Sequence, residues 1–435
     1  MIYADHAATT PLCREARAAM EPYLGELYYN PSAQYRQGIK CRQAVEKSRR
    51  RIAELLGCES GEIYFTSGGS EGNSWAVHNA LFVARQKQWQ QKSTIRDPFG
   101  LAWEESVQAK AAGGRSVGMS YGTGERGGLL LSTPIEHHSL LRAAQAAEQM
   151  GVRYKQIPVD SYGCVLQDSL QERLMEKPAL VSLQYANNEV GTIQQVRELA
   201  ALCKEAGALV HSDAVQAVGH IPVCLDGIDM LTASAHKFGG PKGIGFLYIR
   251  KGAPVSPLIY GGQQESGLRG GTENVAAIVG MTAALEAAVE RMPTEILRLQ
   301  KLEEELREGL REESRDGSEE DIRPGRMEKT ARAERPKLIF RGCKDRHLPG
   351  LCSITLPDME AEQALFRLDL EGIGVSAGAA CDSRKGTQPS HVLTALGLSA
   401  EEAKRTIRIS FGSTNQPGDG KRIAEAILKM LSLYE

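Results

Sequence analysis

The sequence predicts an α/β protein in which a largely parallel β-sheet is flanked by helices and followed by a smaller α+β domain. Two features of the 435 residues lead to this prediction. Short apolar runs typical of strands alternate with amphipathic segments of helix length through the first two-thirds of the chain, which favours parallel strands joined by helices. Nearer the end, one more strand-like run precedes a helix-like segment that closes the chain.

Seven runs supply the expected strands of the large sheet, and most are separated by segments long enough for a helix. In sheets of this kind ligands bind at the carboxyl ends of the strands. Polar residues that follow these runs should therefore converge in space. The runs are EIYFTS from Glu62, GLLLST from Gly128, VRYKQIPV from Val152, ALVSLQYA from Ala179, GALVHSDA from Gly207, DMLTASA from Asp229 and GIGFLYIR from Gly243.

The C-terminal third supplies the elements of the smaller domain. Four leucines at three- and four-residue spacing predict an amphipathic helix packed on the body of the protein. The strand LCSITLP from Leu351 and the helix KRIAEAILKMLSLY from Lys421 then suggest an α+β arrangement. The four leucines are Leu299, Leu302, Leu306 and Leu310.

Two stretches interrupt this pattern. Residues 86–127 are polar and glycine-rich toward their end, and residues 311–337 carry dense mixed charge with almost nothing to bury. Both are expected to be surface excursions or loops. The first contains G-x-G-x-x-G from Gly122, but that run precedes a strand, whereas a dinucleotide fingerprint follows a strand and opens a helix. We therefore do not interpret it as a nucleotide site.

Composition narrows the function classes. The chain has 52 basic and 54 acidic residues, a formal charge of −2, so no overall field attracts nucleic acid or an anionic membrane. No apolar run approaches the roughly 20 residues that span a bilayer. The nine cysteines include no C-x-x-C pair and no secretory leader precedes the first motif, so we expect a cytoplasmic protein without disulfides or a zinc site.

The stretch FTSGGSEGN from Phe65 to Asn73 is the first candidate for a ligand site. A strand ends there, glycines permit a tight turn and a helix begins. Free amides and a hydroxyl at a helix N-terminus suit a phosphate. Ordinary capping, with Ser70 as the N-cap and nothing bound, explains the same stretch equally well.

Two further candidates follow strands at the same edge. Asp213, in HSDAVQ after the run GALV, could hold a cationic heteroaromatic nitrogen or could cap the next helix. Lys237, in TASAHKFGGPKG, could form a Schiff base if partial burial lowered its pKa, with Ser234 and His236 holding a phosphate. A phosphate turn, a strand-end acid and a strand-end lysine, in this order, together predict a pyridoxal-phosphate enzyme.

Cys381 lies among small residues and glycines in SAGAACDSRKGTQPSHV, a segment with weak helix or strand character. A loop of this kind can carry a thiol to a substrate. The other cysteines lie in segments that look more regular, and we expect them to be packing residues. They are Cys13, Cys41, Cys58, Cys164, Cys203, Cys224, Cys343 and Cys352.

Ten ordered blocks resemble the cysteine desulfurases of the class V aminotransferase group, which share the type I pyridoxal-phosphate fold. They run almost from end to end, and the two polar stretches fall outside them. The blocks are DHAATTP at Asp5, NPSA at Asn30, FTSGGSEGN at Phe65, EHHSLL at Glu136, YANNEVGTIQ at Tyr185, HSDAVQAVG at His211, SAHKFGGPKGIG at Ser234, GGQQESGLRGGTEN at Gly261, SAGAACDS at Ser376 and RISFG at Arg408.

The resemblance implies a large cofactor-binding domain at residues 12–265, with the excursion at about 86–127 on its surface. Residues 1–11 and 266–435 would form the small domain. That domain would include the charged loop at about 311–337 and the cysteine loop at about 376–390.

The resemblance also implies a role for each site residue. Lys237 would anchor pyridoxal 5′-phosphate and move the substrate proton, Asp213 would pair with the pyridine nitrogen, and His137 would stack on the ring and serve in proton transfer. Cys381 would be the nucleophile that takes sulfur from L-cysteine as a persulfide, with release of L-alanine. The remaining contacts would be Asn188 and Gln216 to the phenolic oxygen, Gly69, Ser70, Ser234 and His236 to the phosphate, Thr272 to the phosphate from the second subunit of a homodimer, and Arg408 to the substrate carboxylate.

The resemblance further implies a sulfur-acceptor or scaffold protein for iron–sulfur assembly, tRNA thiolation or a related pathway. One departure keeps selenocysteine lyase open as an alternative. The segment from Cys381 to Ser390 is one residue longer than is common among desulfurases, and with its G-x-Q-P-S ending it is similar to those lyases. Another class V aminotransferase would need no cysteine loop, and intact Lys237, Asp213 and His137 oppose a non-catalytic scaffold.

Overall fold

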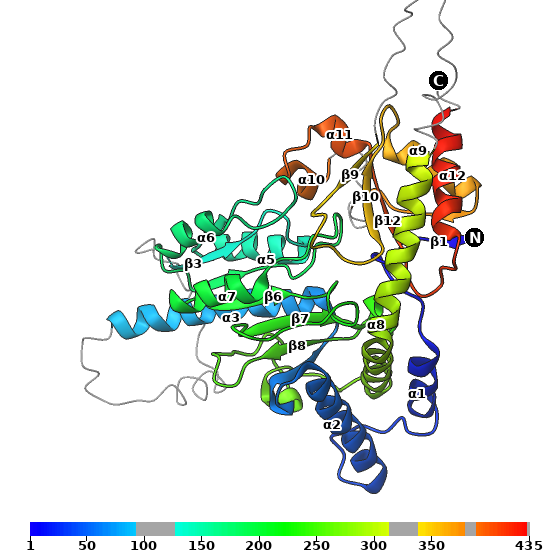
Figure 1. Ribbon diagram of the computed structural model, residues 1–435. Helices are drawn as coiled ribbons and strands as arrows, with labels where there is room; N and C mark the ends of the chain where they lie inside the picture. Colours follow the sequence, from blue (N-terminus) through cyan, green and yellow to red (C-terminus); the bar gives the residue numbers. More distant parts are fainter. Residues whose placement is uncertain (93–126, 313–337, 379–388, 433–435) are drawn as a thin grey trace, which may run out of the picture.

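The computed structural model describes residues 1–92, 127–312, 338–378 and 389–432 (Figure 1). Cys381 and most of both predicted excursions lie outside these residues. The excursion was expected to begin at residue 86, but helix α3 (Gly69–Lys92) continues through residues 86–92. Among the described residues no helix is long and apolar enough to cross a membrane.

A seven-stranded sheet forms the centre of the large unit and confirms the predicted strands. Its order is β2-β8-β7-β6-β5-β3-β4, and only β8 runs antiparallel to its neighbours. The strands are β2 (Ile63–Thr66), β3 (Gly127–Ser132), β4 (Val152–Gln156), β5 (Leu180–Ser182), β6 (Leu209–Asp213), β7 (Met230–Ser234) and β8 (Gly245–Ile249).

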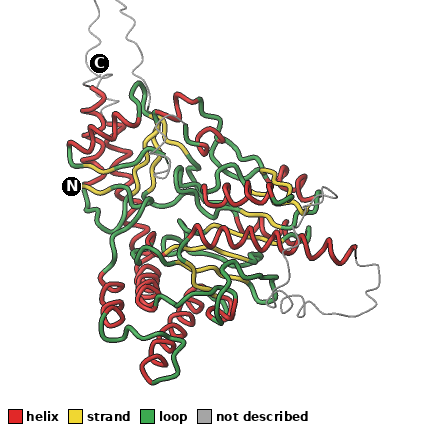
Figure 2. Tube along the Cα trace, turned by 180° about the vertical axis from the view of Figure 1, so that it is seen from behind, coloured by secondary structure: helices red, strands yellow, loops and turns green. Residues whose placement is uncertain are grey.

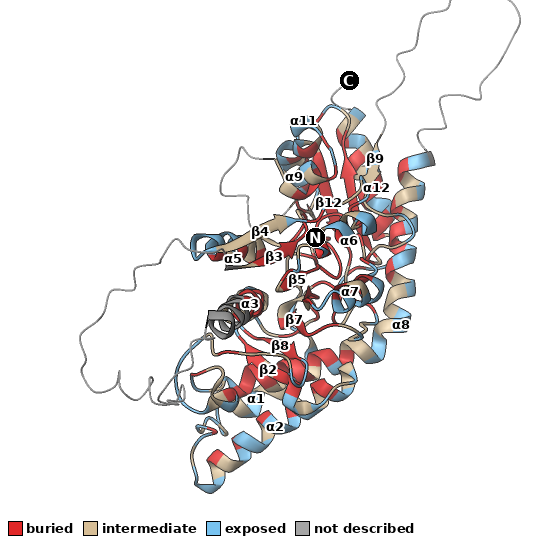
Figure 3. Ribbon diagram, turned by 90° about the vertical axis from the view of Figure 1, so that its left-hand side faces the viewer, coloured by how far each residue is buried: buried red, intermediate tan, exposed pale blue. Residues whose placement is uncertain are grey.

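Both faces of this sheet are buried, which explains its continuous apolar runs. Leu130 and Leu180 pack beneath α3 and α5 (His138–Gln149), whereas the alternate residues Leu129 and Val181 pack beneath α6 (Gln167–Leu174) and α7 (Val196–Glu205). The view from behind shows helices on both sides of the strands (Figure 2). Burial is concentrated along the central strands (Figure 3). The other helical elements of this part are α1 (Arg14–Leu24), α2 (Arg36–Leu56), η1 (Ser60–Glu62), η2 (Ala235–Lys237) and η3 (Gln264–Gly267).

The C-terminal part is an α+β unit, as predicted. Strand β10, from the run LCSITLP, pairs antiparallel with β9 and β12, and β1 pairs parallel with β11. The strands are β1 (Ile2–Tyr3), β9 (Ile339–Arg341), β10 (Leu351–Thr355), β11 (Ile373–Gly374) and β12 (Thr406–Ser410), and the helices are α9 (Ala361–Leu370), α10 (His391–Ala395), α11 (Ala400–Lys404) and α12 (Asp419–Ser432).

Helix α8 (Val275–Glu312) joins the two cores. Its first half contributes Ile278 and Met281 to the core beside the large sheet. Its second half contributes the four leucines predicted as a packed stripe, and Leu306 is fully buried against the C-terminal core. The amphipathic helix is therefore confirmed, while the domain limits at residues 11 and 265 stay a prediction.

Candidate active site

Four elements bring their ends together at the carboxyl edge of the large sheet. Strand β6 ends at Asp213, and β7 ends at Ser234 and leads into η2, which ends at Lys237. Helix α3 begins at Gly69 and α5 begins directly after His137. The structure thus places these predicted residues at one edge, as expected for a parallel sheet.

A cavity of about 390 Å³ lies at the N-terminus of α3. It is lined by four of the five residues predicted to hold a phosphate, together with Lys242. The amide of Gly72 donates to the Gly68 carbonyl at 3.2 Å, so Ser70 lies inside the first turn and the N-cap interpretation of Ser70 is wrong. The first amides of a helix have no intrahelical acceptor and, with the helix dipole, favour an anion. The four predicted residues are Gly69, Ser70, Ser234 and His236.

Two glycines allow α3 to approach the sheet edge this closely. A Cβ at Gly69 would lie 2.8 Å from Cγ2 of Val215, and one at Gly72 would lie 2.6 Å from Cγ2 of Thr232. Distances this short are not tolerated between packed carbon atoms. The glycines of FTSGGSEGN therefore position the helix terminus against the ends of β6 and β7.

His236 and Lys242 supply side chains to the same cavity. Burial, followed by the charges of Lys237 and Lys242, lowers the pKa of His236 to about 4. Its Nδ1 lies 3.1 Å from Oγ1 of Thr9. Near neutral pH the cavity is therefore lined by a neutral imidazole together with the side chain of Lys242, which suits a phosphate.

Asp213 is 3 % exposed and is held by two hydrogen bonds. Its Oδ1 accepts from the amide of Val215 at 3.0 Å, and its Oδ2 accepts from Nδ2 of Asn73 at 2.7 Å. The same Nδ2 lies 2.8 Å from Oγ of Ser139, which in turn lies 2.8 Å from Nδ1 of His137. A chain of hydrogen bonds thus joins the acid of β6 to the histidine that caps α5.

The Ser139 amide also donates to Nδ1 of His137, at 3.2 Å. Nδ1 is therefore the acceptor, and the ring carries its proton on Nε2. Burial lowers the pKa of His137, Asp213 opposes that effect, and Lys237 adds to it. The result is a neutral, oriented imidazole beside the carboxylate.

Lys237 lies beneath the N-terminal segment. Its Nζ donates to the carbonyl oxygens of Ala7 at 2.6 Å and Ala8 at 2.9 Å. Nε2 of Gln216, a predicted cofactor contact, donates to the same Ala7 carbonyl at 2.9 Å. Both side chains therefore converge on one short stretch of backbone.

Arg408 lies on β12 with its side chain 2 % exposed. Its Nη2 donates to Oδ1 of Asp5 at 2.6 Å, and its Nη1 donates to the carbonyl oxygen of Asn188 at 2.8 Å. Its Nε is buried and has no hydrogen-bond partner among the described residues. One donor of the guanidinium thus remains unused at the place where Asn188 and Arg408 meet.

Two predicted site residues do not line the cavity in the described part of this chain. Thr272 is exposed in the loop before α8 and does not line the cavity of its own chain. Cys381 lies outside the described residues, but the flanking residues can be located. Oγ of Ser390 donates to Oε2 of Glu189, and a Cβ on Gly378 would lie 3.3 Å from that oxygen. Both ends of the cysteine segment therefore meet beside Glu189, the neighbour of Asn188.

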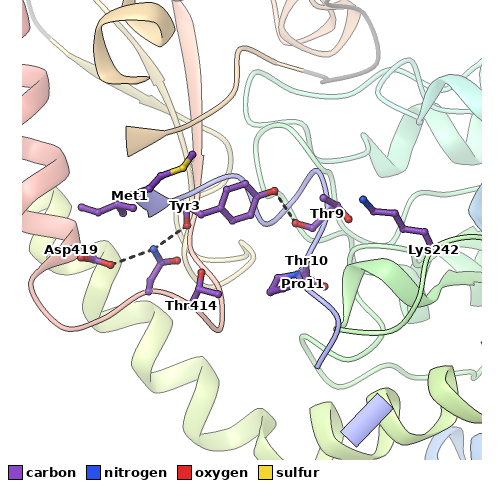
Figure 4. Close-up of a pocket in the computed structure, with 10 residues that line it drawn as sticks. Met1, Tyr3, Thr9, Thr10, Pro11, Lys242, Thr414 and Asp419 are labelled. Atoms are coloured by element: carbon purple, nitrogen blue, oxygen red, sulfur yellow. Dashed lines mark hydrogen bonds between the residues drawn. The ribbon is translucent and has the colours of Figure 1, made fainter. Parts of the chain in front are cut away.

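Sequence reasoning missed the supporting side chains. Asn73, Ser139, Lys242 and Asp5 all lie inside recognised blocks, yet their contacts depend on other segments. Lys242 also lines a second cavity, of about 560 Å³, between the two parts of the chain. Figure 4 shows its side chain near Thr9. In described segments, no cluster of three or more potential metal ligands was found.

The cysteines predicted to be packing residues divide into two groups. Cys41, Cys164, Cys203 and Cys352 are buried, as expected. The other four are only partly buried, and of these Cys13 and Cys58 still pack against the core. Cys343 lies in the connection between β9 and β10, outside regular structure. The other partly buried cysteine is Cys224.

Comparisons with known proteins point in one direction. The sequence model of the family described as "Aminotransferase class-V" matches residues 2–95 and 115–318. The "Cysteine desulfurase IscS" of Dictyoglomus turgidum is 37 % identical over 414 residues, which cover 94 % of this chain and 89 % of that protein.

Solved structures agree with this result. A "NifS-like protein" superposes with a TM-score of 0.79 at 31 % identity, and the match covers 99 % of both chains. A structure described as "SspA in complex with cysteine" superposes with a TM-score of 0.71 at 28 % identity, covering 94 % of this chain and 99 % of that one.

Proposed function

The chain belongs to the class V aminotransferase family as a cysteine desulfurase, and from this premise we propose that pyridoxal 5′-phosphate binds at the carboxyl edge of its large sheet. One observation carries the proposal. A cavity at the N-terminus of α3 holds Ser234 and His236, and Asp213 and Lys237 lie at the same sheet edge. When bound, this cofactor supplies an electron sink next to the substrate α-carbon.

The phosphate group is assigned to the N-terminus of α3. Gly69 and Ser70 offer first-turn amides, while Ser234 and His236 offer side-chain contacts. Lys242 is a further cation at this cavity. Thr272 is assigned to the phosphate site of the partner in a homodimer, and its exposure in the single chain is compatible with that role.

Asp213 is assigned to the protonated pyridine nitrogen. A carboxylate that is buried and held by Asn73 and the Val215 amide cannot rotate away, so it keeps the ring cationic. His137 is assigned to the face of the ring, where its Nε2 proton can be exchanged with the substrate. Asn188 and Gln216 are assigned to the phenolic oxygen.

Lys237 has to release two backbone carbonyls before it can anchor the cofactor. Its Nζ then becomes the group that removes and returns the proton at the substrate α-carbon. The carbonyls of Ala7 and Ala8 would remain hydrogen-bond acceptors for Nζ when the lysine is not attached to the cofactor.

Arg408 is assigned to the carboxylate of L-cysteine. A guanidinium can bind Asp5 and a second carboxylate through different N–H groups. The unused Nε proton and the fixed position of Nη1 on Asn188 support that assignment. The substrate must then compete with Asp5 or share the guanidinium with it.

Cys381 is assigned as the nucleophile that takes the substrate sulfur as a persulfide, while L-alanine leaves. The two residues that flank this segment, Gly378 and Ser390, both lie beside Glu189, the neighbour of Asn188, which supports the assignment. A protein acceptor would remove the sulfur for iron–sulfur cluster, thio-cofactor or tRNA synthesis. Because such a thiol must stay reduced, we expect a reducing compartment such as the cytoplasm.

The test is release of L-alanine from L-cysteine and from L-selenocysteine by the purified, cofactor-loaded protein, with and without a thiol reductant. Turnover of L-cysteine that rises with reductant and is lost in Cys381→Ser supports the proposal. Turnover confined to L-selenocysteine would make the protein a selenocysteine lyase. An unchanged rate in Cys381→Ser would move the nucleophile elsewhere.

A further inference from the structure

A second thiol cluster lies behind the loop that carries Asn188. Three segments meet there: the turn before Cys164, the β9–β10 connection with Cys343 and Arg346, and Thr192. Oγ1 of Thr192 donates to the Tyr162 carbonyl at 2.6 Å and accepts from the Cys343 amide at 3.0 Å. Thr192 therefore holds the two cysteine-bearing segments against each other.

Arg346 lies beside the two thiols. Its Nη2 donates to Sγ of Cys164 at 3.3 Å. The same residue acts to lower the pKa of Cys343, and each of the two cysteines shifts the pKa of the other, as neighbouring groups do. A cation beside two neighbouring thiols favours the thiolate form in which cysteine reacts.

The two cysteines differ in access and in acidity. Burial, with help from Asp160, raises the pKa of Cys164 to about 11. Burial also acts to raise the pKa of Cys343, but the backbone amides of Arg346 and Asp345, together with the side chains of Arg346 and Cys164, bring that pKa below its ordinary value. Cys343 is partly exposed and is followed by the exposed Lys344 and Asp345, whereas Cys164 is 8 % exposed. One sulfur is thus accessible and reactive, and the other is protected behind it.

We propose that Cys343 and Cys164 form a second redox site, separate from the sulfur-transfer cysteine, in which a hydroperoxide-class oxidant creates a disulfide. This proposal does not depend on the assignment of the cofactor site. The cysteines lie in the two parts of the chain, Cys164 beside the large sheet and Cys343 beside β9. A disulfide between them would link these two parts covalently beside Thr192.

The reaction balances as a two-electron oxidation. The Cys343 thiolate attacks the terminal oxygen of the hydroperoxide, the O–O bond breaks, and the alcohol or water leaves with the proton taken from solvent. The sulfenic acid formed on Cys343 is then attacked by the sulfur of Cys164. The S–S bond forms, the S–O bond breaks, and the oxygen leaves as water with the Cys164 proton.

The experiment uses the full-length, cofactor-loaded protein carrying Cys381→Ser, so that the proposed sulfur-transfer cysteine does not consume oxidant. Hydrogen peroxide treatment, alkylation of remaining thiols and trypsin digestion should give residues 342–344 linked to residues 156–173. This product should be absent from Cys164→Ser and Cys343→Ser and should disappear on reduction. The oxidised protein should also melt at a higher temperature than its reduced form.

A second measurement tests the proposal without relying on the amount of disulfide-linked peptide recovered. Iodoacetamide should modify Cys343 at least about tenfold faster than Cys58 near neutral pH, because thiolate content controls the rate. Cys58 is the matched control, since it is also partly buried but burial raises its pKa to about 12. Arg346→Gln should slow the modification of Cys343 and leave that of Cys58 unchanged.

Two results would overturn the proposal. One is alkylation of Cys343 no faster than that of Cys58, which would show that Arg346 and the backbone amides do not stabilise a thiolate. The other is oxidation of Cys343 to sulfinic or sulfonic acid in protein that retains Cys164, without any linked peptide. That result would show that Cys164 does not resolve the oxidised sulfur.

Discussion

The edge of the large sheet and the junction with the C-terminal unit differ in the charge state of their side chains. At the sheet edge, His236 and His137 have lowered pKa values and are neutral near pH 7. At the junction, Arg408 is paired with Asp5, and His347 is paired with Glu303 at 2.9 Å. The edge can receive an anion and a charged ring, whereas the junction must share or exchange a partner that it already holds.

This difference bears on how the site binds its ligands. A neutral imidazole and first-turn amides bind a phosphate without breaking an existing ion pair. Removing one member of a buried ion pair is costly, because the other charge stays buried. Cofactor binding should therefore depend mainly on the sheet edge, and substrate selection mainly on the junction.

The largest expected effect is at the sheet edge. Lys237→Ala should lower alanine release by about 10²–10⁴-fold or more, since it removes the group that transfers the α-proton. The visible absorption of bound cofactor should also be lost. Lys242→Ala is the matched control five residues away, and it should keep activity with cofactor affinity weakened less than about tenfold, because its charge is exposed. Equal losses of alanine release in both variants would contradict the assignment of different roles to Lys237 and Lys242.

The junction should respond through substrate affinity. Arg408→Lys should raise KM for L-cysteine by about 10- to 100-fold, as expected from losing charge-assisted hydrogen bonds, and should change kcat much less. Arg341→Lys, on strand β9 of the same three-stranded sheet and paired with Glu402, is the control and should leave KM unchanged. A fall in kcat alone for Arg408→Lys would contradict the carboxylate assignment.

Asp5→Asn sharpens the same comparison through stability. It keeps an oxygen that can accept from Nη2 but leaves the buried guanidinium without its counter-charge, so we expect a loss of about 2 kcal/mol in the free energy of unfolding. Added substrate should recover part of this loss by supplying a carboxylate. Chemical unfolding with and without substrate measures both effects. Unchanged stability in the Asp5→Asn variant would show that Asp5 does not compensate the guanidinium.

The two regions should also differ in pH dependence. Burial lowers the pKa of His211, beside the sheet edge, to about 3. Below about pH 6.5 this histidine is therefore protonated in the unfolded chain but stays neutral in the folded protein. This contribution to stability falls as the pH drops below about 6.5. The bond to Glu303 raises the pKa of His347, so its contribution is present at low pH and is lost as the pH rises through the folded value.

Thermal unfolding at several pH values separates these contributions. His347→Gln should lower the melting temperature more at about pH 5.5 than at about pH 8.5. Wild-type protein should lose stability between about pH 6.5 and pH 4, and its unfolding in this range should take up protons. The reason is that the pKa values of three histidines are lowered in the folded protein; they are His211, His6 and His236. An equal effect of His347→Gln at both pH values would contradict the ion pair.

The smallest effect is expected from Glu136→Gln. Burial, followed by Asp213, raises the pKa of this fully buried carboxyl well above its ordinary value, which favours its neutral form. Glutamine keeps an acceptor for the Gln184 amide, which donates to Glu136 Oε1 at 2.8 Å. We expect a change below about 1 kcal/mol in unfolding free energy and near-normal activity. Asp213→Asn, the same chemical change nearby, should instead abolish most activity.

The sequence predicted the sheet well because strand patterns are local. The seven apolar runs became seven strands, and the leucine stripe became the buried face of α8. The positions of Lys237 and Asp213 followed from the rule that parallel strands end at one edge. Contacts between distant segments could not be predicted in this way, since no local pattern encodes them.

Two examples show which contacts could not be predicted from the sequence. The hydrogen bonds from Asp213 through Asn73 to Ser139 join three separate elements, and each residue alone resembles an ordinary helix or cap residue. Cys343 acquires its character from Arg346 and from Cys164, which lies far away in the sequence. Side-chain chemistry of this kind depends on tertiary packing rather than on local pattern.

The most direct test of the sheet-edge assignment is to trap the cofactor with borohydride in the full-length protein and to locate the modified lysine by peptide mass spectrometry. The account predicts a pyridoxyl adduct on Lys237 and none on Lys242. An adduct on another lysine, or alanine release by protein in which no lysine can be trapped, would contradict the assignment of the cofactor to the carboxyl edge of the large sheet.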